Sequence, residues 1–128
     1  VIAETDGEVD FYSSRGGPIQ QASLDRELLL KHKIADTNIF SRKVRCLTFD
    51  SLIRESGLSA IDLLQIDAEG YDAKIIRMIN FEKVKPFVIR FEHVHLAEED
   101  VDNCMNLLAT KGYKFWCERR DVIAVLDM

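Results

Sequence analysis

The chain has 128 residues, of which 47% are hydrophobic and 30% are charged. This length suits one domain with a sizeable core, and the composition excludes the collagenous, low-complexity and disordered classes. Seventeen Lys and Arg against 22 Asp and Glu give a formal net charge of -5, the wrong sign for a protein that binds the nucleic-acid backbone. We therefore expect a single globular domain over residues 1–128, with no nucleic-acid partner.

No apolar run approaches the roughly 20 residues that cross a bilayer, because the longest, Ile61–Ile66, is interrupted by Asp62 and Gln65. The first residues also lack the cationic start and apolar stretch of a signal peptide. We therefore expect no membrane partner and a cytoplasmic location. Three cysteines share apolar surroundings and no C-x-x-C spacing, which favours buried, reduced thiols over disulfides or a zinc site: Cys46, Cys104 and Cys117.

The first third of the chain predicts short extended segments and one helix. Val1–Tyr12 predicts two strands around a tight turn at Thr5–Gly7. The segment 13–43 is the least regular part of the sequence, so we interpret it as a variable insert. Within it, Leu24–Lys31 predicts a short helix that Ser23 would cap.

Regular structure follows the insert. Alternation of apolar and polar residues predicts a strand at Val44–Thr48. Asp50 can then cap a short helix over Ser51–Glu55, which Gly57 would end.

The next part of the chain predicts one β-α-β unit. Ile61–Asp67 is a nearly continuous apolar strand, which is typical of a parallel strand covered by helices on both faces. A helix capped by Asp72 carries isoleucines on one face within Ile75–Ile79. Phe87–Glu92 predicts the second buried strand.

A helix and a hairpin complete the sequence. Asp100–Lys111 has the apolar spacing of a helix, and Tyr113–Glu118 with Val122–Leu126 predicts an antiparallel hairpin. We expect Trp116, within this hairpin, to lie in the core. The alternating order of strands and helices predicts an α/β fold with a mostly parallel sheet.

Acidic side chains follow both predicted buried strands. Asp67 and Glu69 follow the first strand, and Glu92 and His93 follow the second. Because neighbouring parallel strands lie about 4.8 Å apart and ligands bind beyond their carboxyl ends, these groups would converge on one cleft. Capping of a helix start is the alternative for Glu69 and Asp72. Two acids held near each other, such as Asp67 and Glu92, are typical of a functional site.

The histidines give no standard metal motif. His93 and His95 lie on opposite faces of an extended chain, so they cannot chelate one ion without a bend. With Asp67 and Glu92 they could form a mixed oxygen and nitrogen site, but the spacing matches no known signature, and we expect no metal. His32 lies between two lysines and is expected to be a solvated surface residue.

The segment from Ile61 to Asp72, read as Ile-Asp-Leu-Leu-Gln-Ile-Asp-Ala-Glu-Gly-Tyr-Asp, resembles the hallmark strand and turn of the FkbM family of S-adenosylmethionine-dependent methyltransferases. Flanking segments are also similar to that family: Ile2–Phe11, Gln21–Leu24, Thr48–Leu52, Pro86–His93 and Gly112–Tyr113. This resemblance spans nearly the whole chain. It implies the class I methyltransferase sheet, a Rossmann-like fold, with S-adenosylmethionine as cofactor and a small-molecule hydroxyl as methyl acceptor.

The resemblance also implies roles for individual residues. Asp67 and Glu92 would orient the acceptor or remove its proton, whereas Glu69 would hold the turn and His93 would contact substrate. The candidate catalytic residues are therefore Asp67, Glu92, Glu69 and His93. The residues expected at the cofactor are Ala3, Glu4 and Asp67.

The sequence lacks one part of the family pattern. None of its six glycines forms a G-x-G turn after a strand, the turn that holds the methionine part of the cofactor. The chain therefore resembles the C-terminal portion of such an enzyme, and we expect it to bind the cofactor weakly or not at all and to be inactive in isolation. We also expect a homodimer, because the strand that ends at Asp67 would leave an apolar edge.

Two other functions remain open from the sequence. One is a non-catalytic interaction module that has lost the cofactor half. The other is a metal-dependent hydrolase that would use Asp67, Glu69, Glu92, His93 and His95.

Overall fold

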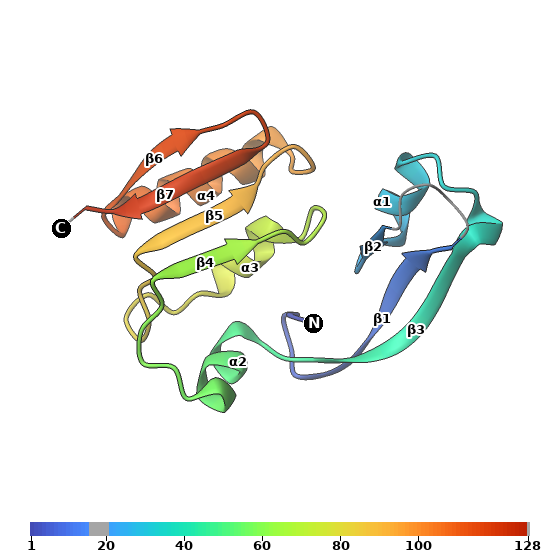
Figure 1. The fold of residues 1–128 in the computed structure, drawn as a ribbon, viewed down its shortest axis with the longest axis horizontal. Coiled ribbons are helices and arrows are strands. Elements are labelled where there is room, and N and C mark those ends of the chain that lie inside the picture. The colour runs from blue at the N-terminus through green and yellow to red at the C-terminus, as the bar shows by residue number, and fades with distance from the viewer. Residues whose placement is uncertain (16–20, 128) are drawn as a thin grey trace.

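The computed structural model describes residues 1–15 and 21–127, and within them it contains two β-sheets flanked by helices (Figure 1). The smaller sheet has the antiparallel strand order β2 (Ala22–Ser23), β1 (Gly7–Ser14) and β3 (Ile39–Cys46). The larger sheet has the order β4 (Leu63–Ile66), β5 (Val88–Glu92), β7 (Asp121–Leu126) and β6 (Tyr113–Cys117). The helices are α1 (Arg26–Lys31), α2 (Phe49–Ser56), α3 (Asp72–Met78) and α4 (Glu98–Thr110), with a 3-10 turn at Asp36–Asn38. No described helix has the length and apolar character needed to cross a membrane.

The larger sheet contains the predicted β-α-β unit and hairpin. Strands β4 and β5 are parallel neighbours, with Leu63 opposite Val88 and Ile66 opposite Phe91. Strands β6 and β7 form the expected antiparallel hairpin, and β7 also pairs antiparallel with β5. Of these three pairings only β4 with β5 is parallel, so the α/β class is confirmed, whereas a mostly parallel, Rossmann-like sheet is not.

Helices α3 and α4 lie together on one face of the larger sheet (Figure 1). The isoleucine face of α3 is buried as predicted, with Ile76 completely inaccessible to solvent. It meets Ile89 and Phe91 of β5, which are also fully buried, and Leu108 of α4. The local helical period therefore placed this part of the core correctly.

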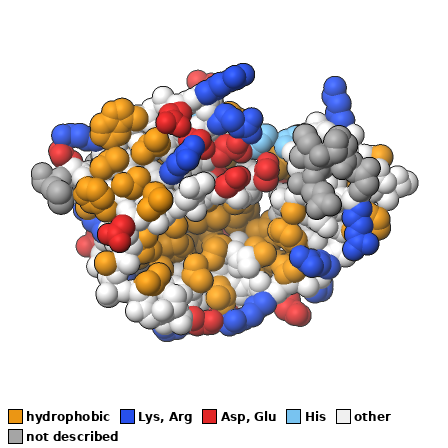
Figure 2. Space-filling model, viewed as in Figure 1, with side chains coloured by type: hydrophobic (Ala, Val, Ile, Leu, Met, Phe, Trp, Pro, Cys, Tyr) orange, Lys and Arg blue, Asp and Glu red, His pale blue; other side chains and the backbone are white. Residues whose placement is uncertain are grey.

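The opposite face of the larger sheet is not covered by the described residues. Leu63 of β4 is 57% exposed and Trp116 of β6 is 56% exposed. Figure 2 shows hydrophobic side chains gathered over this face and in the hollow beside it. The predictions of a core Trp116 and of helices on both faces of β4 are therefore wrong. The prediction of a buried Cys117 is also wrong, although strand alternation turns it away from the face that carries Trp116; Cys117 is exposed as the last residue of β6.

The smaller sheet occupies much of the segment interpreted as an irregular insert. Residues 13–43 contribute the end of β1, all of β2 and α1, and most of β3, while residues 16–20 lie outside the described part. Strand β3 thus begins well before the predicted Val44. A bridge between Ile2 and Leu47 continues the chain toward the larger sheet, where Ile2 and Phe49 pack against the core.

Two predicted helix caps are wrong. Asp25, not Ser23, caps α1 and accepts a hydrogen bond from the Glu27 amide. Ser23 lies in β2, and its hydroxyl accepts from the Asp25 amide instead. Helix α2 begins after Thr48, whose hydroxyl accepts from Ser51 at 3.2 Å, so Asp50 falls within the first turn. In both helices, the end of the preceding strand determines which residue stands at the cap position, and the side chain of that residue accepts from a free amide of the first turn.

Strand β4 has a free edge in the described structure. It pairs with β5 on one side only, so the other side presents unpaired backbone groups next to the exposed Leu63. Such an edge favours pairing with another chain. The homodimer inferred from the sequence therefore stays a prediction.

Sedimentation of the chain at micromolar concentration checks this prediction. We expect a dimer for the native chain and a monomer for Leu63→Lys, because a charge on the edge strand opposes pairing. Leu58→Lys is the matched control, since Leu58 is 53% exposed and lies outside β4, and it should leave the dimer intact. A monomeric native chain would refute the edge-pairing idea.

Candidate functional site

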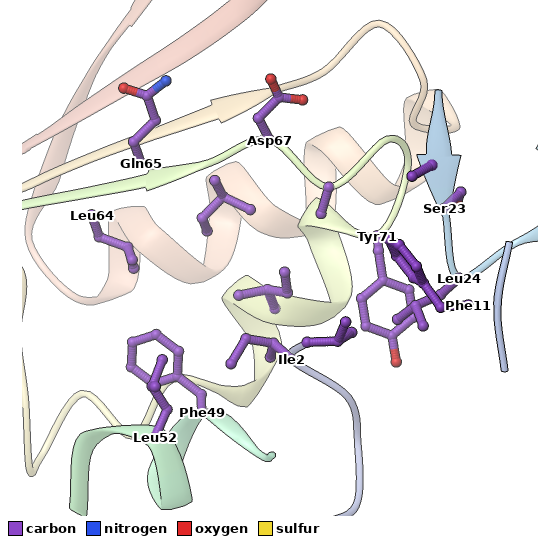
Figure 3. Close-up of a pocket in the computed structure, with 15 residues that line it drawn as sticks. Ile2, Phe11, Ser23, Leu24, Phe49, Leu52, Leu64, Gln65, Asp67 and Tyr71 are labelled. Atoms are coloured by element: carbon purple, nitrogen blue, oxygen red, sulfur yellow. The ribbon is translucent and has the colours of Figure 1, made fainter. Parts of the chain in front are cut away.

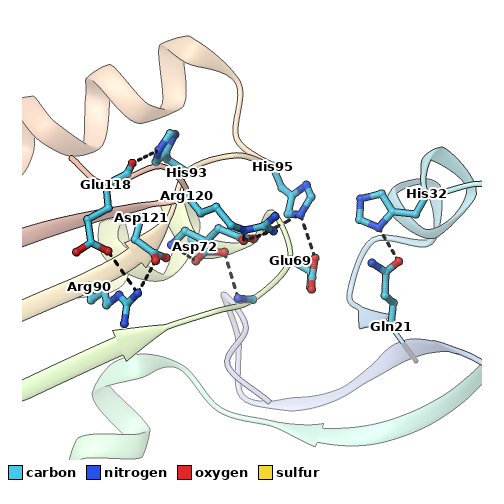
Figure 4. A network of polar contacts seen from close by, with 12 residues as sticks. Gln21, His32, Glu69, Asp72, Arg90, His93, His95, Glu118, Arg120 and Asp121 are labelled. Carbon is cyan, nitrogen blue, oxygen red and sulfur yellow. Dashed lines mark hydrogen bonds and ion pairs between the residues drawn. The ribbon is translucent and has the colours of Figure 1, made fainter. Parts of the chain in front are cut away.

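Three side chains from the carboxyl ends of β4 and β5 come together at one point. The Nε2 atom of His95 lies 3.4 Å from Oε2 of Glu69 and 3.4 Å from Oε2 of Glu92 (Figure 4). We call these three residues the Glu–Glu–His cluster. The sequence correctly indicated that acids following the two strands would meet, and it identified Glu69 and Glu92 as two of them.

The turn between β4 and α3 places Glu69. Glu69 has a φ of +48° and Gly70 a φ of +92°, so two successive residues adopt the left-handed backbone. The φ of Gly70 is one that residues with a side chain rarely adopt, and the carbonyl oxygen of His95 would lie 3.4 Å from a Cβ atom added there, which is ordinary contact. The Oε2 atom of Glu69 is inaccessible to solvent and has no hydrogen-bond partner.

Glu92 is the last residue of β5, and its side chain is only 11% exposed. Its Oε1 atom accepts hydrogen bonds from Nε and Nη2 of Arg120, at 3.0 and 2.6 Å. This pair raises the pKa of Arg120 and neutralises one carboxylate of the cluster. The other oxygen, Oε2, is left facing His95.

Asp72 joins the carboxyl ends of β4 and β5 through hydrogen bonds to both. It is completely buried, its Oδ2 accepts from the Ala68 amide and its Oδ1 accepts from the Glu92 amide, both at 3.2 Å. Burial raises the pKa of Asp72 above its ordinary value, although the two amide donors act in the opposite direction. The predicted capping role of Asp72 is wrong, because Tyr71 occupies the cap position of α3. No sequence pattern separates a helix cap from an acceptor that joins two strands.

The other predicted catalytic residues lie outside the cluster. Asp67 is exposed, and no hydrogen bond or ion pair of the described residues joins it to Glu92. The Nε2 atom of His93 lies 3.4 Å from the carbonyl oxygen of Glu118, so His93 and His95 point to different partners, as their alternation implied. No sequence pattern shows that His95 joins Glu69 and Glu92, because its position depends on the bend of the chain after β5.

His32 approaches the cluster from α1. Its Nδ1 atom lies 2.6 Å from Oε1 of Gln21, and its ring centre is 4.9 Å from that of His95 (Figure 4). The prediction of a solvated surface histidine is therefore wrong. Helix α1, folded back beside the turn at Gly70, brings His32 there, and Leu28 of this helix contacts the same turn.

A cavity of about 390 Å³ opens beside β4 (Figure 3). Its walls are mainly apolar, and Asp67 lies at its edge with the carboxylate turned away from Ile2 and Phe49. The lining includes Ile2, Phe11, Phe49, Leu52, Leu64, Asp67 and Tyr71. Burial, followed by the charge of nearby Glu4, raises the pKa of Tyr71.

A second cavity of about 340 Å³ lies between α1 and the turn at Gly70. Its lining is more polar and includes Asp25, Lys31, Glu69, Lys74 and His95. The two cavities share the wall formed by Ser23, Leu24 and Tyr71. Two members of the Glu–Glu–His cluster, Glu69 and His95, therefore border a space large enough for a small ligand.

Ala3 and Glu4, predicted at the cofactor, lie near the first cavity. Ala3 is 4% exposed, and its amide donates to the Leu47 carbonyl at 2.9 Å. Glu4 is exposed and close to Tyr71. Their roles at a cofactor stay predictions, since Ile2 rather than either of them lines the cavity.

The described residues fit S-adenosylmethionine only in part. The apolar cavity suits an adenine ring, and Asp67 at its edge suits a hydroxyl or cationic group. Among residues 1–15 and 21–127, however, no glycine turn after a strand offers several amides to the carboxylate of the methionine part. These residues alone therefore do not make a complete site for that cofactor.

Comparison with known proteins gives one finding. A family model described as the methyltransferase FkbM domain matches residues 2–115. No curated protein and no solved structure matches the chain. The matched range includes both strand ends and all three members of the cluster.

Proposed function

Because the chain belongs to the FkbM methyltransferase domain family, we propose that it supplies the acceptor side of an S-adenosylmethionine-dependent methyltransferase. The acceptor in this proposal is a hydroxyl group of a small molecule. The observation that carries it is the convergence of Glu69, Glu92 and His95 at the carboxyl ends of two parallel strands, beside a cavity.

Methyl transfer to a hydroxyl requires positioning and the loss of a proton. The cofactor supplies an activated methyl group, and the residues of this chain act on the acceptor. Oε2 of Glu69, Oε2 of Glu92 and Nε2 of His95 can hold the hydroxyl proton as it leaves. Arg120 keeps Glu92 in place from its other oxygen. In this proposal His93 and Asp67 serve at the edges, toward substrate and cofactor.

We further propose that the chain corresponds to the C-terminal part of the methyltransferase fold. Two observations support this: the free edge of β4, and a partial fit of the cofactor beside that edge. Weak cofactor binding by the isolated chain remains the expected consequence.

Transfer of a labelled methyl group from S-adenosylmethionine tests the function in the product of the complete reading frame that contains this chain. We expect transfer to hydroxyl-bearing small molecules, and a rate about 10²-fold lower for Glu92→Gln, because removing a proton acceptor costs that much or more. Glu99→Gln, at an exposed position in the first turn of α4, is the matched control and should keep the native rate. Native transfer by Glu92→Gln, or no transfer to any hydroxyl, would contradict the proposal.

A further inference from the structure

We propose that Glu69, Glu92 and His95 form a binding site for a divalent transition-metal ion such as Zn²⁺. One donor atom from each residue lies within 4.8 Å of the other two. One imidazole nitrogen and two carboxylate oxygens are ligands that Zn²⁺ accepts in proteins.

The spacing of the donor atoms fits a shared ion better than direct hydrogen bonds. His95 Nε2 is 3.4 Å from each Oε2, and neither contact has the geometry of a hydrogen bond. Hydrogen bonds between nitrogen and oxygen are about 2.7–3.2 Å long. A tetrahedral ion with bonds of about 2.1 Å separates neighbouring ligands by about 3.4 Å. The two separations from His95 therefore match those of ligands on one such ion, and the two carboxylate oxygens lie within 4.8 Å of each other.

The hydrogen bonding of Glu69 also indicates a missing ligand, although its side chain as a whole is 30% exposed. Glu69 Oε2 is shielded from solvent yet accepts no hydrogen bond, although buried polar atoms nearly always have a partner. Glu92, which is 9% exposed, turns its second oxygen to the same point. A cation between these two oxygens would satisfy both.

The negative charge of the cluster is suited to binding a cation. Arg120 binds Glu92 through Oε1, whereas Oε2 of Glu92 is the oxygen near His95, and the charge of Glu69 also acts on Arg120 without an ion pair between them. Hydrogen bonds of this kind to a ligating carboxylate are usual around metal sites. Among the described residues Glu69 forms no ion pair with a Lys or Arg, and its short contact is with His95.

The site would be open on one side. Glu69, Gly70 and His95 line the 340 Å³ cavity, so a fourth coordination position faces that space. Three protein ligands and one open position are typical of catalytic rather than structural zinc. This role rests on the proposed function: the ion would bind the acceptor hydroxyl and lower its pKa, Glu69 and Glu92 would serve as its ligands, and the hydroxyl proton would pass to water in the cavity.

Metal titration of the purified, chelator-treated chain tests the site. We expect one Zn²⁺ per chain by calorimetry, and visible absorption of a tetrahedral complex when Co²⁺ is used instead. The affinity for Zn²⁺ should fall at least tenfold in His95→Ala and in Glu69→Gln. The second variant keeps the test valid if His95→Ala does not fold. Glu99→Gln is the matched control and should bind like the native chain, because Glu99 is exposed in the first turn of α4 and lies outside the cluster.

All titrations are made in a Cys117→Ser background, since Cys117 is an exposed thiol that can bind zinc by itself. Absence of stoichiometric binding, or equal affinity in folded His95→Ala and the native chain, would overturn the proposal. The assay contains neither cofactor nor acceptor. A failure of metal binding is therefore distinct from a failure of methyl transfer.

Discussion

Replacing Asp72 with alanine should lower the free energy of unfolding by about 3 kcal/mol or more. The change leaves the amides of Ala68 and Glu92 buried without acceptors, and each such loss costs about 1–3 kcal/mol. Urea unfolding followed by circular dichroism measures the effect. Asp102→Ala, at an exposed position of α4, should change stability by less than about 0.5 kcal/mol. A stable Asp72→Ala chain would show that these two bonds do not hold the strand ends.

The pH dependence of the same residue has a definite sign. Burial raises the pKa of Asp72 above its ordinary value of 3.8, so the folded chain keeps the proton to higher pH than the unfolded chain. The stability that this proton provides is present below the unfolded pKa and is lost as pH rises through the folded one. The stability of the native chain relative to Asp72→Asn should therefore fall as pH rises from about 4. A constant difference from pH 3 to 7 would contradict the shift.

Phe91→Ala should cost about 3–5 kcal/mol, because it empties the centre of the larger sheet's core. Phe91 is completely buried between neighbours of β4 and β7, opposite Ile66 and Val122. Trp116→Ala removes a larger ring, yet we expect less than about 1 kcal/mol, since Trp116 is 56% exposed. If Phe91→Ala does not fold, Phe91→Leu can be compared with Trp116→Ala instead, because its expected loss of unfolding free energy is smaller. Equal costs for the phenylalanine and tryptophan variants would refute this assignment of the core.

The spacing of apolar residues within a single helix or strand correctly predicted the elements that depend on local sequence. The isoleucines of α3 follow a helical period, and the hairpin of β6 and β7 follows strand alternation. Which face of a strand is covered depends on distant elements instead. Leu63 and Trp116 look like core residues in the sequence, but the described helices pack on the other face.

The site was predictable where strand ends define it. Glu69 follows β4 and Glu92 ends β5, and α/β folds commonly carry their ligand sites at the carboxyl ends of parallel strands. The sequence pattern points to His95 only within a wider set of possible metal ligands, because its position depends on the bend after β5. Asp72 was assigned to the wrong role, since its partners are backbone amides that no side-chain pattern reveals.

The long connection within the smaller sheet bears on the order of folding. Its ladder pairs residues as distant as Gly7 and Cys46, whereas β6 and β7 are joined by a tight loop. Closing a long loop loses more chain entropy, so contacts of this kind form slowly. We expect the hairpin and the parallel pair to assemble first during refolding, and the β1–β3 ladder last. Helix α1 lies inside the loop that this ladder closes, so the wall of the cavity facing His95 would be completed in the final step.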